Sequence, residues 1–481
     1  MGIRKYLLAA LIFFYHSICL GALHSDTLVL TVRPSQNDFE SIQKALDTQT
    51  SGPLKVVLSG SFRIFDVLIT KRHSTTIEFT QGAVLHLMNR NTGGILLQHN
   101  NCHVKNGYIK GSAKSALTFY EGYGVMFYGV SNCSVQNTVF DRISGLSIYL
   151  APNERNKGCV ANYVFNNRII NPAINLIGNG DESGILLGYS GKGYSHRDNI
   201  IKNNFIDGNN VLKVGIGIIG HGNNNTFWAN EIKNCLCYGI ISYESQSTDT
   251  ALSGSKILHN AISNIGQVGD EKTVKGMGIY LMKSHNSVVK GNKVYNTLRN
   301  SDRSETLGAG AITTSGSVGS LVDSNYIDGS EMYGYVNDYS FNSIFSNNTI
   351  LNTRKSGAYF INVNNVKVVN NTFRNIGEVV FKGYFEHTSL PYIKQQWRIK
   401  TYLNQSTGNN IIIENNHIYS GKDILYFTGT APEKNNRGNT IFRNYFKGNR
   451  IYGNVKKISN LVFYREEKSG ENYIINNVIN K

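Results

Sequence analysis

The segment GAYFINVNNVKVVNNTFRNIG, residues 357–377, decides the fold of this chain. Its short runs of alternating apolar and polar residues are separated by Asn or Gly, which is typical of short strands joined by tight turns. A second segment, GIYLMKSHNSVVKGNKVYNTL at residues 278–298, has the same pattern. The two segments therefore indicate a repeated unit of strand, turn and strand.

An Asn followed two residues later by an apolar or aromatic residue recurs through the chain. The thirteen positions are Asn106, Asn137, Asn167, Asn204, Asn230, Asn260, Asn292, Asn325, Asn348, Asn371, Asn416, Asn444 and Asn477. Neighbouring positions lie 23 to 45 residues apart, and periods of this size are typical of solenoids. Asn tolerates the left-handed backbone region and its amide bonds nearby backbone, so we interpret these residues as structural corners.

The whole pattern predicts an all-β protein, a parallel β-helix solenoid of about 12–13 coils. Residues 1–22 are predicted to be a cleaved signal peptide, because Arg4 and Lys5 precede an apolar run. Residues 23–93 are expected to form an N-terminal cap and the first strands, with an amphipathic capping helix from Asp38 to Leu46. Residues 94–481 are expected to form the solenoid, with a loop insertion at 382–410. No later segment is apolar enough to span a membrane, so we expect a secreted or periplasmic protein.

The chain is basic, with a formal net charge of +16. An exported basic protein meets polyanions, and we expect an acidic polysaccharide rather than nucleic acid as the partner. Cys102 and Cys133 fall at matching positions in adjacent coils, where either a disulfide or two buried thiols would fit. The sequence leaves open whether the protein is a monomer or a homotrimer.

The order of these elements resembles a known superfamily. The run D-x-x-x-I-Q-x-A-L (Asp38 to Leu46) is followed by V-V-L-x-G-x-F-x-I (Val56 to Ile64) and then by Asn-rich coils. This arrangement resembles right-handed parallel β-helix proteins of the pectate-lyase-like superfamily. The resemblance implies the fold and an action on polysaccharide, but it does not choose among lyases, hydrolases, epimerases and depolymerases.

Polar and aromatic residues gather at one edge of the predicted coils. When coils are aligned on the Gly that opens a strand, such as Gly239 or Gly278, the ends of successive strands fall into one column. This column contains Tyr128, Tyr149, Tyr189, His221, Tyr243, Glu244, Lys283, Asp338 and Tyr339. Because stacked strands lie about 4.8 Å apart, we predict that these side chains form the functional site.

The candidate catalytic residues are Lys283, His221, Glu244 and Tyr243. Lys283 or His221 is predicted to be a base that removes a proton next to a uronate carboxylate, and Tyr243 or Tyr189 is predicted to be the proton donor. Glu244 is predicted to orient Lys283 or to hold a divalent cation such as calcium. The candidate substrate-binding residues are Tyr189, Tyr149, Tyr128, Asp338, Tyr339 and Trp397.

Residues 279–286, IYLMKSHN, resemble the strand-then-Lys-Ser segment of alginate lyases and chondroitinases on this fold, in which the Lys is the base. Those enzymes pair it with an Arg from the next coil, whereas here the next coil reads AITTSGS from Ala311. Because a Lys follows the strand here as in those enzymes, the expected function is a polysaccharide lyase that acts by β-elimination. A glycoside hydrolase, a uronan epimerase, and a non-catalytic polysaccharide-binding or envelope-assembly protein remain alternatives.

Overall fold

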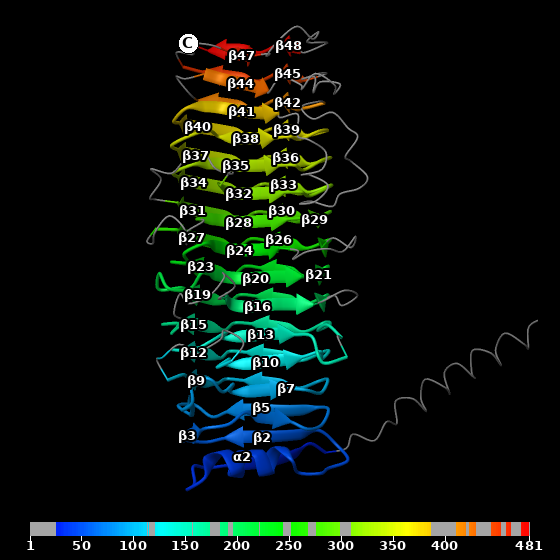
Figure 1. Ribbon diagram of the computed structural model, residues 1–481, viewed down its shortest axis with the longest axis vertical. Helices are drawn as coiled ribbons and strands as arrows, with labels where there is room; N and C mark the ends of the chain where they lie inside the picture. Colours follow the sequence, from blue (N-terminus) through cyan, green and yellow to red (C-terminus); the bar gives the residue numbers. More distant parts are fainter. Residues whose placement is uncertain are drawn as a thin grey trace, which may run out of the picture.

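The computed structural model describes residues 26–112, 114, 121–155, 157–173, 183–190, 196–220, 222–243, 252–267, 276–298, 309–385, 410–419, 423–429, 444–453, 458–462 and 473–480. The described chain forms one column of stacked coils, with helix α2 (Asp38–Leu46) at one end and the C terminus at the other (Figure 1). It is the one helix among these residues.

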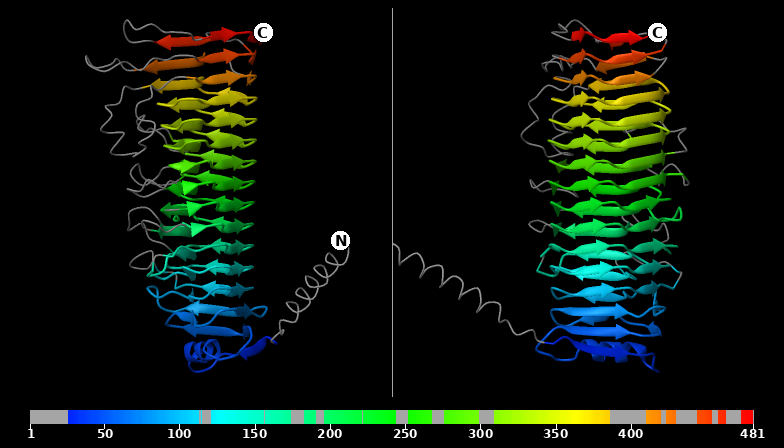
Figure 2. Two further views of the ribbon diagram at one scale, coloured as in Figure 1. Left: turned by 90° about the vertical axis from the view of Figure 1, so that its right-hand side faces the viewer. Right: turned by 180° about the vertical axis from the view of Figure 1, so that it is seen from behind.

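Each coil gives one strand to each of three long sheets, and every strand pair in the described part of the chain is parallel (Figure 2). Sheet A contains β1 (Leu28–Val32), β2 (Leu54–Leu58), β5 (Thr75–Phe79), β8 (His103–Lys105), β11 (Ser134–Gln136), β14 (Tyr163–Phe165), β18 (Ile200–Lys202), β22 (Thr226–Trp228), β26 (Lys256–Leu258), β30 (Val288–Lys290), β33 (Leu321–Asp323), β36 (Ile344–Ser346), β39 (Lys367–Val369), β42 (Ile412–Glu414), β45 (Tyr445–Lys447) and β48 (Tyr473–Ile475).

Sheet B contains β3 (Ser61–Ile64), β6 (Val84–Leu87), β9 (Tyr108–Lys110), β12 (Val139–Asp141), β15 (Arg168–Ile170), β19 (Phe205–Asp207), β23 (Glu231–Lys233), β27 (Ala261–Ile265), β31 (Lys293–Thr297), β34 (Tyr326–Ser330), β37 (Thr349–Thr353), β40 (Thr372–Ile376), β43 (His417–Tyr419), β46 (Arg450–Tyr452) and β49 (Val478–Asn480).

Sheet C contains β4 (Leu68–Thr70), β7 (Ile95–Leu97), β10 (Val125–Tyr128), β13 (Ile148–Ala151), β16 (Ser183–Ser190), β20 (Val214–Gly220), β24 (Tyr238–Tyr243), β28 (Met277–Met282), β32 (Gly310–Ser315), β35 (Tyr333–Asp338), β38 (Ala358–Ile361), β41 (Val379–Phe385), β44 (Asp423–Gly429) and β47 (Ser459–Val462). A short fourth sheet joins β17 (His196–Arg197), β21 (Gly222–Asn223), β25 (Leu252–Ser253) and β29 (Ser284–His285).

The predicted parallel β-helix is thus confirmed, and its core follows from strand alternation. In β38, Ala358 and Phe360 point inward and are fully buried, while Tyr359 and Ile361 are half-buried on the outer face. Register then places Phe381 on Ala358 and Ala358 on Tyr335, so each inward row is a continuous apolar stack. The thirteen Asn positions mark thirteen sheet A strands from β8 onward, and β1, β2 and β5 precede them.

The Asn residues near each turn have two separate structural roles, which the sequence pattern did not distinguish. Buried residues such as Asn371 form a ladder of hydrogen bonds from coil to coil. The backbone N–H of Asn371 donates to Asn416 Oδ1 at 2.8 Å, and the side-chain Nδ2 of Asn371 donates to the same oxygen at 3.0 Å. The left-handed corner is the preceding residue, such as Asn370 with φ 57°. Asn106 and Asn137 occupy this corner position instead of the ladder, because their φ values are 59° and 52°.

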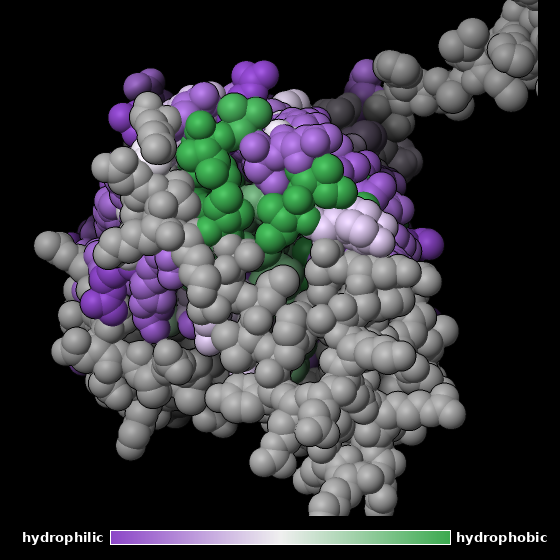
Figure 3. Space-filling view, turned by 90° about the horizontal axis from the view of Figure 1, so that it is seen from above, coloured by the Kyte–Doolittle hydropathy of each residue, from purple (hydrophilic) through white to green (hydrophobic). Residues whose placement is uncertain are grey.

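The predicted capping helix covers the first coil. Asn37 caps α2 by accepting the N–H of Glu40 at 3.2 Å, and Ile42 and Leu46 are fully buried against the first strands. The opposite end is different, because β48 and β49 expose Ile474, Val478 and other apolar side chains (Figure 3). The apolar core is therefore closed by a helix at one end of the described chain.

Two further expectations concern the cysteines and the domain boundaries. Cys102 and Cys133 are buried free thiols, and the N–H of Cys102 donates to Cys133 Sγ at 3.3 Å. The sheets continue without interruption across residue 94, since β4 already pairs with β7. Of the expected insertion at 382–410, residues 382–385 belong to β41, and the described chain resumes at Asn410. The expected signal peptide at 1–22 lies outside the described residues.

Candidate functional site

The outer face of sheet C carries a polar patch between two apolar clusters. Towards α2, the first cluster is formed by Leu146, Tyr149, Ala151, Leu186 and Ile219. Towards the C terminus, the second is formed by Leu298, Met332, Tyr333 and Val336. The polar patch between them consists of Tyr243 on β24, Tyr280 on β28, Thr313 and Ser315 on β32, and Asp338 on β35. It is the candidate site.

Asp338 is the central acid of this patch. Strand register pairs Met282 with Ser315 and Ser315 with Asp338, so the three share one outer row. Ser315 Oγ donates a hydrogen bond to Asp338 Oδ2 at 2.9 Å. Burial raises the pKa of Asp338 to about 7, although the Ser315 hydrogen bond acts in the opposite direction. A carboxyl group with this pKa exchanges a proton readily near neutral pH.

Tyr280 extends the hydrogen-bonded group by one coil. Its phenol bonds Ser315, and its ring stacks on Tyr238 with centroids 5.5 Å apart. Burial raises the pKa of Tyr280, the charge of Asp338 adds to that effect, and Tyr243 adds more. Tyr280 therefore stays protonated at neutral pH and is a proton donor one coil away from Ser315.

A left-handed corner follows directly after these strands. Lys283, Gly316, Tyr339 and Asn362 occupy equivalent positions, because each N–H donates to the carbonyl at the end of the next sheet C strand. Their φ values are 52°, 59°, 46° and 50°. A residue with a Cβ costs about 1–2 kcal/mol in this conformation, so Lys283 and Tyr339 are strained. The coil-to-coil backbone bonds place Lys283 and Tyr339 on either side of Gly316.

The structure places the predicted site residues in three groups. Tyr243, Lys283, Asp338 and Tyr339 come together at the polar patch and its corner. Tyr149 is buried in the first apolar cluster, and Tyr128 packs against that cluster from its edge. The prediction that Tyr149 shares the strand-end column is wrong, since Tyr149 pairs with Met126 rather than with Tyr128.

The remaining predicted residues are not described structurally. His221, Glu244 and Trp397 lie outside the described residues, and Tyr189 belongs to β16 without a described side chain. Across the described ranges, no three His, Cys, Asp or Glu side chains gather as a metal site would require. The roles of His221 and Glu244, and the calcium site at Glu244, therefore stay predictions.

Sequence reasoning missed Ser315 and Tyr280. The Gly alignment placed Ser315 one position too far along, because Gly310 is not level with Gly278 and Gly334 in the strand register. The register pairs Ile279 with Ile312 and Ile312 with Tyr335, so Ala311 is the residue level with those glycines. Aligning the inward apolar residues instead of the glycines would have put Ser315 beside Asp338.

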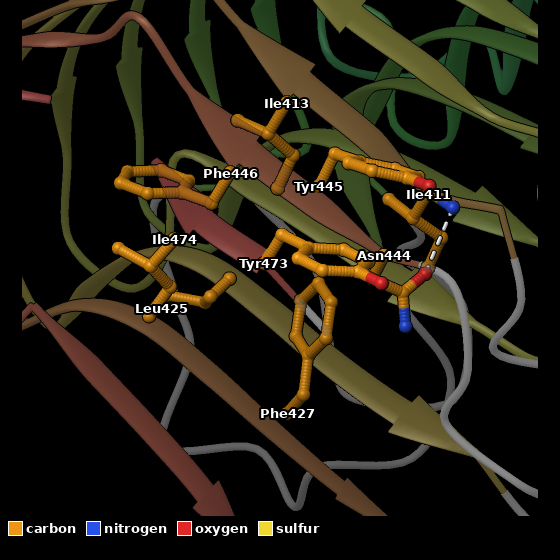
Figure 4. Close-up of a pocket in the computed structure, with 9 residues that line it drawn as sticks. All are labelled: Ile411, Ile413, Leu425, Phe427, Asn444, Tyr445, Phe446, Tyr473 and Ile474. Carbon is orange, nitrogen blue, oxygen red and sulfur yellow. Dashed lines mark hydrogen bonds between the residues drawn. The ribbon is translucent and has the colours of Figure 1, made fainter. Parts of the chain in front are cut away.

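A small pocket at the C-terminal end is not a second site of this kind. It has a volume of about 20 Å³, and Figure 4 shows apolar and aromatic side chains such as Ile413, Phe427 and Phe446 converging on it. Its polar member, Asn444, accepts the N–H of Ile411 at 2.8 Å. This volume is close to that of one water molecule, so the pocket is a packing gap in the end of the core.

A family model described as a right-handed β-helix region matches residues 230–388, which include the polar patch. No curated protein matches the sequence significantly. No helix among the described residues has the length and apolar character that a membrane crossing needs.

Several solved structures share the general fold. The A-module of a mannuronan C-5 epimerase from Azotobacter vinelandii is 13% identical, with a TM-score of 0.42, over 92% of this chain and 94% of its own. The surface adhesin PfbA of Streptococcus pneumoniae is 13% identical, with a TM-score of 0.44, over 91% and 89%. The catalytic unit of an alpha-1,3-glucanase from Streptomyces thermodiastaticus is 10% identical, with a TM-score of 0.41, over 92% and 66%. At these identities the likeness concerns the fold alone.

Proposed function

We propose that this protein is an exported enzyme that acts on an acidic polysaccharide by removing the proton next to a uronate carboxylate, as a β-eliminating lyase does. The observation that carries the proposal is Asp338, a partly buried carboxyl with a pKa of about 7 that receives a hydrogen bond from Ser315. Its proton affinity matches the task of a general base at neutral pH.

In the proposed reaction, the Asp338 carboxylate takes the proton from the carbon that bears the uronate carboxylate. The electron pair left behind forms a carbon–carbon double bond, and the bond to the glycosidic oxygen breaks. That oxygen leaves with the second electron pair and takes a proton from Tyr280 or Tyr243. The ammonium of Lys283 neutralises the substrate carboxylate and thereby lowers the barrier to proton removal. Lys283 thus changes from the predicted base to an electrostatic role.

The charge environment favours proton abstraction over hydrolysis by two carboxylates. Hydrolysis needs a second carboxylate across the scissile bond, and a second negative charge close by would raise the pKa of Asp338. Within the described residues, only burial and Ser315 shift that pKa. An epimerase shares the first step and differs in returning the proton, so product analysis must separate the two.

The first test uses Asp338→Asn, which keeps the size of the side chain and a carbonyl acceptor for Ser315. The variant and the wild type are incubated with alginate, polygalacturonate and hyaluronan, and the ultraviolet absorbance of unsaturated uronate and the reducing ends are measured. We expect new absorbance from the wild type, and a loss of about 100-fold or more in the variant. Reducing ends without absorbance would instead mean hydrolysis, and an altered uronate composition without chain cleavage would mean epimerisation.

The second test uses the pH dependence and the variant Ser315→Ala. Because the base must be deprotonated, wild-type activity should rise with pH with a midpoint near 7. The Ser315 hydrogen bond lowers the pKa of Asp338, so its removal should move the midpoint to higher pH. Thr313→Ala, a substitution on the same strand, is the matched control. An unmoved midpoint in Ser315→Ala would exclude Asp338 as the titrating base.

A further inference from the structure

A groove near the capped end of the column carries cations on a different sheet from the candidate site. It has a volume of about 800 Å³ and is lined by residues of β6 and of the segments that follow β3, β6 and β9. Its lining includes Phe65, His86, Met88, Arg90 and Lys114. We define this surface as the basic groove. It lies on sheet B, whereas Asp338 lies on sheet C.

A row of basic residues on the outer face of sheet B enters the basic groove at His86. Register pairs Arg63 with His86 and His86 with Lys110, so the three lie on successive strands of one outer face. Successive strands are about 4.8 Å apart. Burial lowers the pKa of His86, and the positive charges of Lys110 and Arg63 lower it further. His86 is therefore neutral near pH 7, and the positive charges of Arg63 and Lys110 on either side of it attract an anion.

The carboxylates next to the row already have other partners. Asp38 accepts the backbone N–H groups of Ser35 and Arg63 at 2.8 and 2.7 Å. Asp141, which pairs with Lys110 in register, accepts Tyr108 Oη at 3.0 Å and Asn171 Nδ2 at 3.0 Å. Among the ion pairs of the described residues, none involves Arg63, Arg90, Lys110 or Lys114.

The groove also has an apolar contribution that suits a sugar. Phe65 exposes 66% of its surface and Met88 exposes 40%, both beside the cations. An exposed aromatic ring next to charged donors binds a sugar ring on its face while the donors hold the carboxylate. A small inorganic anion would use the cations but would leave Phe65 without a contact.

We propose that the basic groove is a second, non-catalytic binding site for a carboxylate-bearing polysaccharide. The choice of ligand rests on the proposed function, because both sites then bind the same polymer. Five coils separate β9 from β27, the sheet B strand that directly precedes β28, which corresponds to about 24 Å. A polymer long enough to reach both sites gains affinity from the second contact without any new contact at Asp338.

The test measures binding of polygalacturonate in the Asp338→Asn background, so that turnover does not enter the result. The pair Arg90→Glu and Lys114→Glu reverses two exposed cations of the groove, and we expect binding about tenfold or more weaker, with a shallower salt dependence. The matched control, Lys293→Glu with Lys367→Glu, changes the net charge equally at exposed positions outside the groove and should change binding little. Equal losses in both pairs, or no loss in either, would overturn the proposal.

Two further arms identify the ligand class. Phe65→Ala leaves the charge unchanged and should weaken polygalacturonate binding without changing its salt slope. Duplex DNA serves as a polyanion without uronate, and groove-dependent binding of DNA as tight as that of polygalacturonate would overturn the assignment to a polysaccharide. If the wild type shows no turnover of any of the uronate polymers while groove binding is intact, the proposed function is rejected and the groove remains a binding site, so the two failures are distinguishable.

Discussion

Two rows of stacked side chains run along this molecule, and they differ in whether each side chain forms hydrogen bonds with both of its neighbours in the row. In the ladder that includes Asn371, every amide donates to the next Asn and accepts from the previous one, so the buried polar atoms are matched. In the outer row of sheet C, the neighbours Met282, Ser315 and Asp338 are chemically different. The row of identical Asn residues stabilises the stacked coils, whereas the mixed row contains the Asp338 carboxyl group, whose pKa is raised.

The largest expected effect comes from breaking the ladder. Asn371→Ala removes the acceptor of two bonds from Asn348, and it removes the side-chain N–H donors to Asn416 Oδ1 and to the Phe345 carbonyl, while the backbone N–H of residue 371 still bonds Asn416 Oδ1. Unmatched buried polar groups cost about 1–3 kcal/mol each, so we expect a loss of roughly 3–5 kcal/mol in the free energy of unfolding. Chemical denaturation measures it.

Asn370→Gly is the matched control for that variant. Asn370 is the exposed corner residue immediately before Asn371, and its φ of 57° suits Gly. The substitution keeps the backbone bond from the Asn370 N–H to Glu414, and we expect a change below about 1 kcal/mol. Equal effects at the two positions would contradict the division of roles between corner and ladder.

A smaller effect, with opposite signs at two aspartates, is expected from pH. The pKa of Asp338 is about 7 in the folded protein, above its ordinary value of 3.8, so its ionisation destabilises the fold and stability falls as pH rises from about 4 to 7. Burial opposes ionisation of Asp323 as well, but hydrogen bonds from Asn347, Lys290, Ser346 and Ser324 hold its pKa at about 2. Asp323 therefore stabilises the fold above pH 4, and that contribution is lost as pH falls towards 2.

The measurement is the melting temperature of wild type, Asp338→Asn and Asp323→Asn as a function of pH. Asp338→Asn should gain stability relative to wild type above pH 7, by on the order of 2 kcal/mol. Asp323→Asn should lose stability relative to wild type above pH 4 and approach it near pH 2. A loss of stability in Asp338→Asn above pH 7 would contradict the raised pKa, because it would mean that the fold stabilises the ionised carboxylate.

The smallest effect concerns the strained corner. Lys283→Gly removes a Cβ from the left-handed region, where Gly fits without strain, and should stabilise the fold by about 0.5–1 kcal/mol. The same variant should lose activity, because the ammonium that neutralises the substrate carboxylate is gone. Lys283→Ala keeps the strain and also lacks the ammonium, so it should lose activity without the gain in melting temperature. Full activity in both variants would remove Lys283 from the site.

The sequence by itself determined the fold. The Asn repeat and the alternation of residues such as Ala358 and Phe360 specify stacked parallel strands, because a period of two and a buried amide next to a corner are local properties of the chain. The capping helix was equally visible, since Asn37, Ile42 and Leu46 lie within one short segment. These features need no knowledge of which coil lies on which.

Only the tertiary structure decided the site. Ser315, Asp338 and Tyr280 are distant in sequence, and a shift of one residue in the alignment of Gly310 hid the hydrogen bond between Ser315 and Asp338. Register is set by the inward stack of Ile279, Ile312 and Tyr335, so packing inside the coil determines which polar groups meet outside it. The altered pKa of Asp338 depends on burial by neighbouring coils, and burial is a property of the assembled column.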